Sequence, residues 1–189
     1  MIRIDREAPA EAGARDSLLD LAMGRRRRRK TSEHLREGRL PAEGLSFSAT
    51  EKGRLIGTLR LWHVSAGRER PALLLGPLAV HPSYRNRGVG SALIQVATAK
   101  AKALGHRAVL LVGDEPYYKR FGFSRALAAH LRMPGPFECD RFLALELVPN
   151  ALRDASGLVT ATGEKLPIAP EKSTGIAAKS LTSRARRAS

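Results

Sequence analysis

A short glycine-rich loop carries the residues whose types and spacing point most directly to chemistry. Arg85–Gly90 reads RNRGVG and lies between an apolar run and a strongly helical stretch. The first N–H groups of a helix have no intrahelical acceptor, and the helix dipole adds about half a positive charge there. Gly88 and Gly90 would let a ligand approach the backbone, while Arg85 and Arg87 would supply cationic donors. The loop is therefore predicted to bind an anion of pyrophosphate size.

The bare R-x-x-G-x-G pattern leaves a simpler interpretation open, because glycines in a strand-to-helix turn often serve backbone geometry alone. The loop lacks the G-x-G-x-x-G order of the dinucleotide fingerprint, and no Gly-Lys-Ser/Thr follows it as in a P-loop. Ser91 has no evident His/Asp partner, so a nucleophilic triad is not expected. The five histidines and Cys139 are scattered without ligand spacing, so we expect no metal site.

The elements around the loop form a strand, a helix and a second strand. Ala72–Val80 is almost wholly apolar, as a strand covered on both faces would be. Ala108–Val112 is a second buried strand, so the order predicts a right-handed crossover between parallel strands. The helix between them should bury one face, which is made of Val89, Leu93, Val96, Ala97, Ala101 and Leu104.

Alternating and helical patterns fill the rest of the chain. Further strands are expected near residues 2–4, 45–50, 54–64 and 142–148, and helices near residues 9–23, 31–35 and 114–121. Thr31 or Ser32 is expected to cap the helix at 31–35.

Two segments together resemble the GNAT family of acyl-CoA-dependent N-acetyltransferases: LLLGPLAVHPSYRNRGVGSALI and AVLLVGDEPYYKRFGF. Their most specific pieces are Leu78–Gly90 and Tyr117–Phe123, in the family's order and spacing, and the resemblance spans roughly Met1 to Val159. The chain is most similar to small bacterial acetyltransferases with GPLAVxP and PYYxRFGF. The resemblance implies an α/β (α+β) fold with a mixed, mostly antiparallel central sheet flanked by helices. Its two central parallel strands are expected to splay.

The resemblance also implies acetyl-CoA as co-substrate and direct attack by a primary amine, either a small molecule or a protein. The strand carrying Leu78, Ala79 and Val80 would bind the pantetheine arm through its backbone. Pro77 fits a bulge in that strand, which could free the Leu78 N–H to polarise the thioester carbonyl, worth ~3–4 kcal/mol. The pyrophosphate would be bound by Arg85, Asn86, Arg87, Gly88, Val89, Gly90 and Ser91.

Tyr118 matches the family tyrosine of Y-x-x-x-G-F, which protonates the departing thiolate. A phenol with a pKa near ~10 is neutral at neutral pH and can donate. The alternative is that Tyr117 and Tyr118 only pack. The general base stays open: Gly76–Val80 holds no carboxylate, and a water relay or an amine that arrives deprotonated is also compatible. The nearby candidates are His63, His81, Asp114 and Glu115.

Positive charge is concentrated in two places. The net charge is +15, and Arg25–Lys30 supplies six consecutive cations. Such a run is commonly a solvated face, yet it could also attract nucleic acid or an acidic partner. Residues 160–189 are rich in Ala, Ser, Thr, Lys and Arg and are predicted to be a disordered basic tail behind a domain at 1–159. The rival function is a catalytically silent GNAT-like binding protein that uses Arg25–Lys30 and this tail.

Length and composition limit the class of protein. The 189 residues fit one domain, and a single cysteine cannot form an internal disulfide. No apolar run approaches the ~20 residues of a membrane span, and Met1 leads into the charged stretch Ile2–Glu7. We therefore expect a cytoplasmic protein with no membrane partner. The acceptor is not specified, and a monomer and a homodimer are both compatible.

Overall fold

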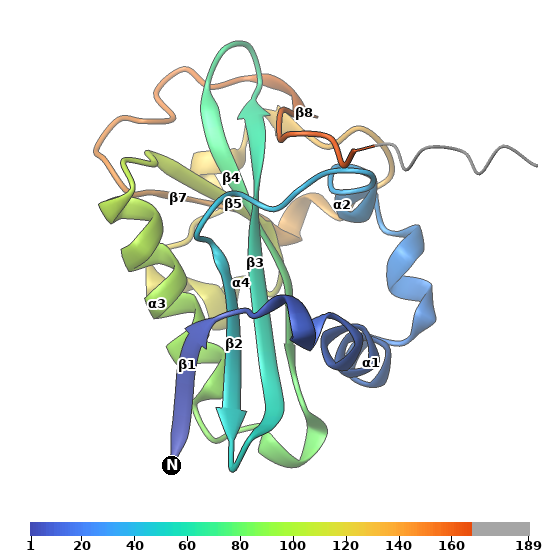
Figure 1. Ribbon diagram of the computed structural model, residues 1–189. Helices are drawn as coiled ribbons and strands as arrows, with labels where there is room; N and C mark the ends of the chain where they lie inside the picture. Colours follow the sequence, from blue (N-terminus) through green and yellow to red (C-terminus); the bar gives the residue numbers. More distant parts are fainter. Residues whose placement is uncertain (168–189) are drawn as a thin grey trace, which may run out of the picture.

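One mixed sheet organises the chain, and the computed structural model describes it over residues 1–167 (Figure 1). Its order is β1-β2-β3-β4-β5-β7, with β8 joined to β3 and β6 joined to β8. Among the described pairs, β4–β5 and β6–β8 are parallel and the others antiparallel, which confirms the predicted sheet. The strands are β1 Ile2–Arg6, β2 Ser46–Glu51, β3 Arg54–Ala66, β4 Pro71–Val80, β5 Ala108–Val112, β6 Leu131–Arg132, β7 Phe142–Glu146 and β8 Gly157–Ala161.

Helices cover both faces of this sheet (Figure 1). Leu78 and Val80 pack into the cluster that contains the buried side of α3, whereas Ala79 packs against Leu18 and Leu19 of α1. Because neighbouring strand residues point to opposite faces, α1 and α3 lie on opposite sides of β4. The helices are η1 Pro9–Glu11, α1 Ala12–Met23, η2 Arg25–Arg29, α2 Thr31–His34, η3 Pro82–Tyr84, α3 Val89–Ala103, α4 Glu115–Tyr118, η4 Lys119–Phe121, η5 Ala126–Ala128 and η6 Cys139–Arg141.

Two local predictions about helices are wrong. Val96 and Leu104 are 38% and 47% exposed, because α3 turns the side with buried Ile94 toward the sheet and Leu104 follows the last helical residue. Lys30, rather than Thr31 or Ser32, is the N-cap residue of α2. The Thr31 hydroxyl instead donates to the Pro136 carbonyl, so a long-range contact takes the group that local capping would have used.

Strand β4 is irregular where Pro77 was predicted to cause a bulge. Leu59 of β3 faces Leu78, but Leu61 faces Leu75, so Gly76 and Pro77 together oppose one β3 residue. The indole N–H of Trp62 donates to the Gly76 carbonyl over 2.6 Å and holds the bulge from the side. This register confirms the predicted irregularity.

The parallel neighbour of β4 separates from it before the bulge. The pairs Leu73–Val109 and Leu74–Leu110 join β4 to β5, and beyond Leu74 the register records no further β5 partner within the described chain. The C-terminal half of β4 thus has β3 on one side and an opening on the other, as expected for two splayed strands.

The basic run and the C-terminal region are more ordered than the sequence suggested. Arg25–Arg29 forms η2, and Arg27 is only 6% exposed with its Nε 3.0 Å from Asp20 Oδ1, so a purely solvated run is wrong there. Strand β8 pairs Thr160 with Ser65, which places the end of the folded domain beyond residue 159. The rest of the predicted tail, from residue 168, lies outside the described residues. No helix within residues 1–167 has the length and hydropathy to cross a membrane.

Candidate functional site

A cavity of about 550 Å³ lies at the N-terminus of α3. Most of the residues predicted to bind the cofactor line it: Val80, Arg85, Asn86, Gly88, Val89, Gly90 and Ser91. The structure adds three residues that the sequence analysis did not assign to this site, namely Tyr84, Tyr117 and Arg120.

The loop at this cavity depends on its two glycines for different reasons. Gly88 is the N-cap of α3 at φ +78°, a left-handed conformation that favours glycine. A Cβ on Gly90 would lie 2.9 Å from the Tyr117 hydroxyl, so a side chain there would collide with the wall. The N–H groups of Val89, Gly90 and Ser91 belong to the first turn of α3, where a helix leaves its donors unpaired. The cavity therefore combines free backbone donors with nearby cations.

Arg120, which the sequence analysis did not assign to the site, lies on the cavity wall where Arg87 was expected. Arg120 donates to the Ser91 hydroxyl over 3.0 Å and lies 4.2 Å from the centre of the Tyr117 ring, which places its charge on the cavity wall. Arg87 turns away to Glu51, 3.2 Å from its carboxylate. A hydrogen bond from Tyr84 and then the charge of Arg87 lower the pKa of Glu51. Arg120 follows the two tyrosines in the chain, and only the fold brings it beside the loop.

Alternation along β4 decides which of its backbone groups can meet a ligand. The His81 N–H donates to the Ile56 carbonyl of β3. Because hydrogen-bonded pairs alternate along an antiparallel ladder, the N–H and C=O of Ala79, two residues earlier, also point toward β3, at Thr58. Ala79 was predicted to help bind the cofactor through its backbone, and this register directs its N–H to β3 instead. The N–H groups of Leu78 and Val80 point the other way, into the opening beside β5.

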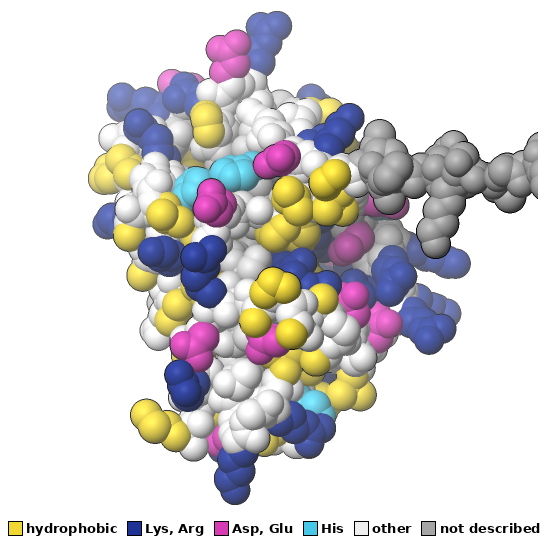
Figure 2. Space-filling view, in the orientation of Figure 1, with side chains coloured by type: hydrophobic (Ala, Val, Ile, Leu, Met, Phe, Trp, Pro, Cys, Tyr) yellow, Lys and Arg dark blue, Asp and Glu magenta, His cyan; other side chains and the backbone are white. Residues whose placement is uncertain are grey.

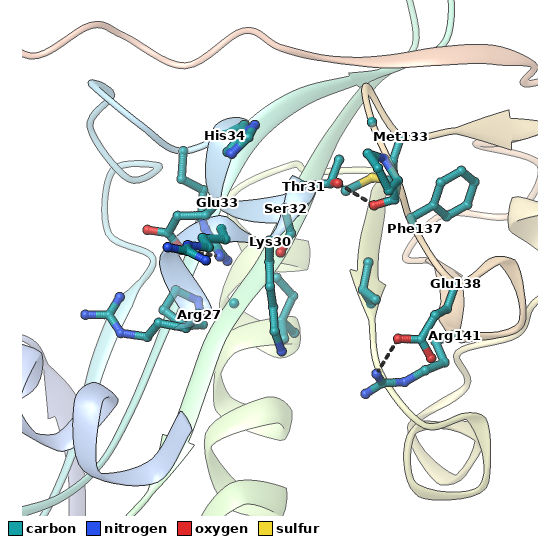
Figure 3. Close-up of a pocket in the computed structure, with 18 of the residues that line it drawn as sticks. Arg27, Lys30, Thr31, Ser32, Glu33, His34, Met133, Phe137, Glu138 and Arg141 are labelled. Carbon is teal, nitrogen blue, oxygen red and sulfur yellow. Dashed lines mark hydrogen bonds and ion pairs between the residues drawn. The ribbon is translucent and has the colours of Figure 1, made fainter. Parts of the chain in front are cut away.

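A second cavity, of about 390 Å³, reaches the same edge of β4 from another direction. One wall comes from η2 and α2, and the facing wall comes from residues 133–141, as Figure 3 shows. The hydrogen bond from Thr31 to Pro136 joins the two walls. Leu78 lines this cavity and Val80 lines the first one, so the two cavities flank a three-residue segment of β4.

Tyr117 and Tyr118 are divided between the cavities. Tyr118 lines the second cavity, with its ring centre 5.0 Å from that of Tyr117 and 5.8 Å from that of Phe123. Gly113 leaves room for it, because a Cβ there would lie 2.2 Å from the Tyr118 ring. Burial, with smaller effects of Tyr117 and Asp114, raises the pKa of Tyr118 to about 12. Its phenol is therefore a protonated group at neutral pH, as a proton donor must be.

None of the four candidate bases lines either cavity. His63 lies against His106, with 5.4 Å between ring centres, and His81 Nδ1 accepts from the Ser83 N–H. Asp114 Oδ1 lies 3.0 Å from Arg141 Nε, and Glu115 accepts from the Arg125 N–H over 3.4 Å.

The carboxylates that do line the second cavity are Glu33 and Glu138. They form ion pairs with Arg36 at 2.7 Å and with Arg141 at 3.2 Å. The sequence analysis did not assign Glu33 and Glu138 to a site, because no local motif indicates that these residues lie near β4. Within residues 1–167, no three His, Cys, Asp or Glu side chains gather as a metal site requires.

Comparisons with known proteins agree with this arrangement. A model of the acetyltransferase (GNAT) family matches residues 15–123, more than half of the chain. The chain belongs to the GNAT family of acetyltransferases. It is 30% identical over 160 residues to the uncharacterized N-acetyltransferase YhbS of Escherichia coli (strain K12), covering 84% of this chain and 94% of YhbS. The predictions of the family, the fold and an acetyltransferase are confirmed.

Two similar solved structures contain the cofactor itself. One is YhbS from Escherichia coli in complex with CoA, at 30% identity and a TM-score of 0.71, covering 86% of this chain and 89% of that one. The other is a GNAT family acetyltransferase from Brucella melitensis in complex with acetyl-CoA, at 26% identity and a TM-score of 0.61, covering 79% and 90%. Both bear out acetyl-CoA as the expected co-substrate class.

Proposed function

We propose that this acetyltransferase moves the acetyl group of acetyl-CoA to a primary amine by direct attack of the amine. The observation that carries the proposal is the meeting of two cavities at one short segment of β4, through Val80 on one side and Leu78 on the other. Relatives crystallised with CoA and acetyl-CoA support the assignment of one cavity to the cofactor. The second cavity is then the place for the amine.

The first cavity would hold the pyrophosphate and the pantetheine arm. The N–H groups of Val89, Gly90 and Ser91 would donate to the phosphate oxygens, with Arg85 and Arg120 adding charge at the wall. The outward N–H of Val80 would bind the pantetheine arm. The N–H of Leu78 would donate to the thioester carbonyl, and one such donor is worth ~3–4 kcal/mol when it is already in place.

The chemical step would take place beside Tyr118. The neutral amine attacks the thioester carbon, a C–N bond forms, and the C–S bond breaks as the tetrahedral intermediate collapses. Tyr118, held neutral by burial, gives its proton to the departing CoA thiolate. The proton lost by the amine nitrogen passes to water, and solvent restores the Tyr118 proton.

Turnover of an amine panel tests this function. The wild-type protein should release CoA thiol from acetyl-CoA only when an accepted amine is present, with the product gaining one acetyl group by mass. Thiol release that never depends on an amine would contradict the proposed transfer. Absence of turnover, together with nucleic-acid binding that weakens steeply with salt, would favour the binding protein instead.

A further inference from the structure

The second cavity identifies the class of amine that it would accept. We propose that the acceptor is a small primary amine with an apolar body and an anionic group, a carboxylate or a phosphate, that binds near Lys30. This inference rests on the proposed function, because it assigns the second cavity to the acceptor. It adds the chemistry of the acceptor, which the family does not specify.

Size and wall chemistry favour a small, partly apolar molecule. The cavity measures about 390 Å³, within the range of small-molecule sites and too small for a folded protein surface. Apolar side chains line it from four segments that lie far apart in the chain: Met23, Leu75, Val112, Met133 and Phe137. These walls would bury the body of a small ligand and leave its polar ends to the charged residues.

Cations outnumber the carboxylates that could balance them. Arg27, Arg36 and Arg141 each form an ion pair with a carboxylate. Arg29 and Lys30 also line the cavity, and neither lies within ion-pair distance of a carboxylate in the described part of the chain. Figure 3 shows Lys30 between the two walls, and Figure 2 shows Lys and Arg side chains gathered around the hollow beside α2. The uncompensated charge at this cavity is positive.

Arg36 is a second, independent observation of unbalanced positive charge at this cavity. Its side chain is only 7% exposed, and Nη2 lies 2.7 Å from Glu33, while Nε is buried without a hydrogen-bond partner. Nη1 lies beside the β4 bulge, 3.2 Å from where a Cβ on Gly76 would be. A buried guanidinium with an unused donor is costly. An anion bound in the cavity would offset the cost of this buried positive charge.

The same charges would favour the reactive form of the amine. Nearby cations disfavour a second cation, so they would lower the pKa of an amine bound beside Leu78 and Tyr118. The two carboxylates that line the cavity, Glu33 and Glu138, are already paired with arginines, so neither is free to stabilise a protonated amine. A polyamine, whose second charge would face Lys30 and Arg29, should bind poorly.

Binding of matched products to the protein saturated with CoA tests the inference apart from turnover. The probes are N-acetylphenylalanine, its phosphonate counterpart, the neutral N-acetylphenylalaninamide, and N-acetylphenethylamine, which lacks the anion. An anionic probe should bind about tenfold more tightly or better than both neutral probes, as expected for one charge-assisted hydrogen bond. The stronger of the two anions identifies carboxylate or phosphate as the preferred group. Equal affinities for all four probes would overturn the inference.

Substitution of the cation locates the anion. Lys30→Gln should remove most of the preference for the anionic probe, Lys30→Arg should retain it, and Lys102→Gln, an exposed lysine of α3, should leave it unchanged. A preference that survives Lys30→Gln and also Arg29→Gln would contradict the assigned position. If CoA itself does not bind, the proposed function fails first; if CoA binds and the preference is absent, only this inference fails.

Discussion

The two cavities that flank β4 are built in contrasting ways. The cavity at α3 draws nearly all of its wall from residues 80–91, and it combines the backbone N–H groups of one helix start with nearby arginines. The second cavity is assembled from residues 23–36, 75–78, 112–118 and 133–141, and side chains supply its chemistry. Backbone N–H groups at a helix start do not depend on side-chain identity, so such a site can bind a phosphate group in proteins of very different sequence. A site made from four distant segments can change its specificity with a single side chain.

The largest effect should come from the proposed proton donor, which lines the second cavity. Tyr118→Phe keeps the buried ring but removes the proton donor, so kcat should fall by about 100-fold or more. The Kd for acetyl-CoA should change by less than about twofold, because Tyr118 does not line the first cavity. Steady-state kinetics and titration calorimetry measure the two quantities. The raised pKa of Tyr118, about 12, places loss of its proton well above 10, so kcat should not decline at pH 10 through this group.

Tyr117→Phe is the matched control for that variant. Tyr117 lines the α3 cavity, so its substitution should alter acetyl-CoA binding more than kcat. The reverse pattern would exchange the roles of the two tyrosines.

Strand β4 contributes to both cavities, and the β3 residue opposite its bulge belongs to a buried ion-pair network. Glu7, with a side chain 3% exposed, accepts from Arg60 over 2.7 Å and from Arg15 over 2.6 Å, and Arg60 lies opposite the bulge. Glu7→Gln should lower the free energy of unfolding by about 3 kcal/mol. This value is at the low end of the range for breaking a buried ion pair, because both arginines are partly exposed to solvent. Urea denaturation at neutral pH measures this loss, and the exposed Glu43→Gln serves as control.

Acid should remove the same contribution. Burial alone would raise the pKa of Glu7, but hydrogen bonds from Arg60 and Arg15 outweigh it and lower the pKa below 4.5. A carboxyl with a lowered pKa stabilises the folded state above its unfolded pKa, and this stability is lost as the pH falls through the folded value. The difference between wild type and Glu7→Gln should therefore shrink as the pH drops below 4.5. A constant difference would contradict the ion-pair explanation.

A smaller effect should be confined to the α3 cavity. Arg120→Gln removes a charge from its wall and should weaken acetyl-CoA binding by about tenfold, with kcat at saturation little changed. Its exposed neighbour Lys119→Gln changes the net charge equally and should have almost no effect. Equal losses in both variants would mean that only long-range charge matters.

The smallest effect should be confined to the second cavity. Thr31→Val removes the hydroxyl that joins its two walls at Pro136, and should cost about 1 kcal/mol of stability. The KM for the amine should rise a few-fold while the KM for acetyl-CoA stays constant. Thr98→Val removes a hydroxyl bonded within α3 and should leave both KM values unchanged. A shift in the KM for acetyl-CoA would show that the cavities are not independent.

The same contrast explains what could be predicted from sequence. The β4–loop–α3–β5 unit was predictable because its pattern is local: an apolar strand, glycines at a helix start, and a second apolar strand. The bulge at Pro77 was predictable for the same reason. The family resemblance extended this unit to the whole sheet and to Tyr118.

The second cavity could not be predicted in the same way. Arg27 is buried and pairs with Asp20 across the break between α1 and η2, and no periodic pattern in the sequence indicates this contact. The Thr31 hydroxyl donates to a carbonyl 105 residues later in the chain, so its role has no local signature. His63 was one of the candidate general bases, but it lies against His106, outside both cavities. Which end of a strand a residue occupies, and what packs across from it, is decided by tertiary contacts.

Titration calorimetry of acetyl-CoA most directly tests the claim that the α3 loop binds the cofactor. The wild-type protein should bind acetyl-CoA, and Gly88→Glu should lose binding by at least about 100-fold because its carboxylate would occupy the phosphate position. Gly105→Glu is the matched control, since Gly105 also has a positive φ with open space around it but follows the other end of α3. Binding that Gly88→Glu abolishes and Gly105→Glu preserves is the predicted result. Equal affinity in Gly88→Glu and wild type would contradict it.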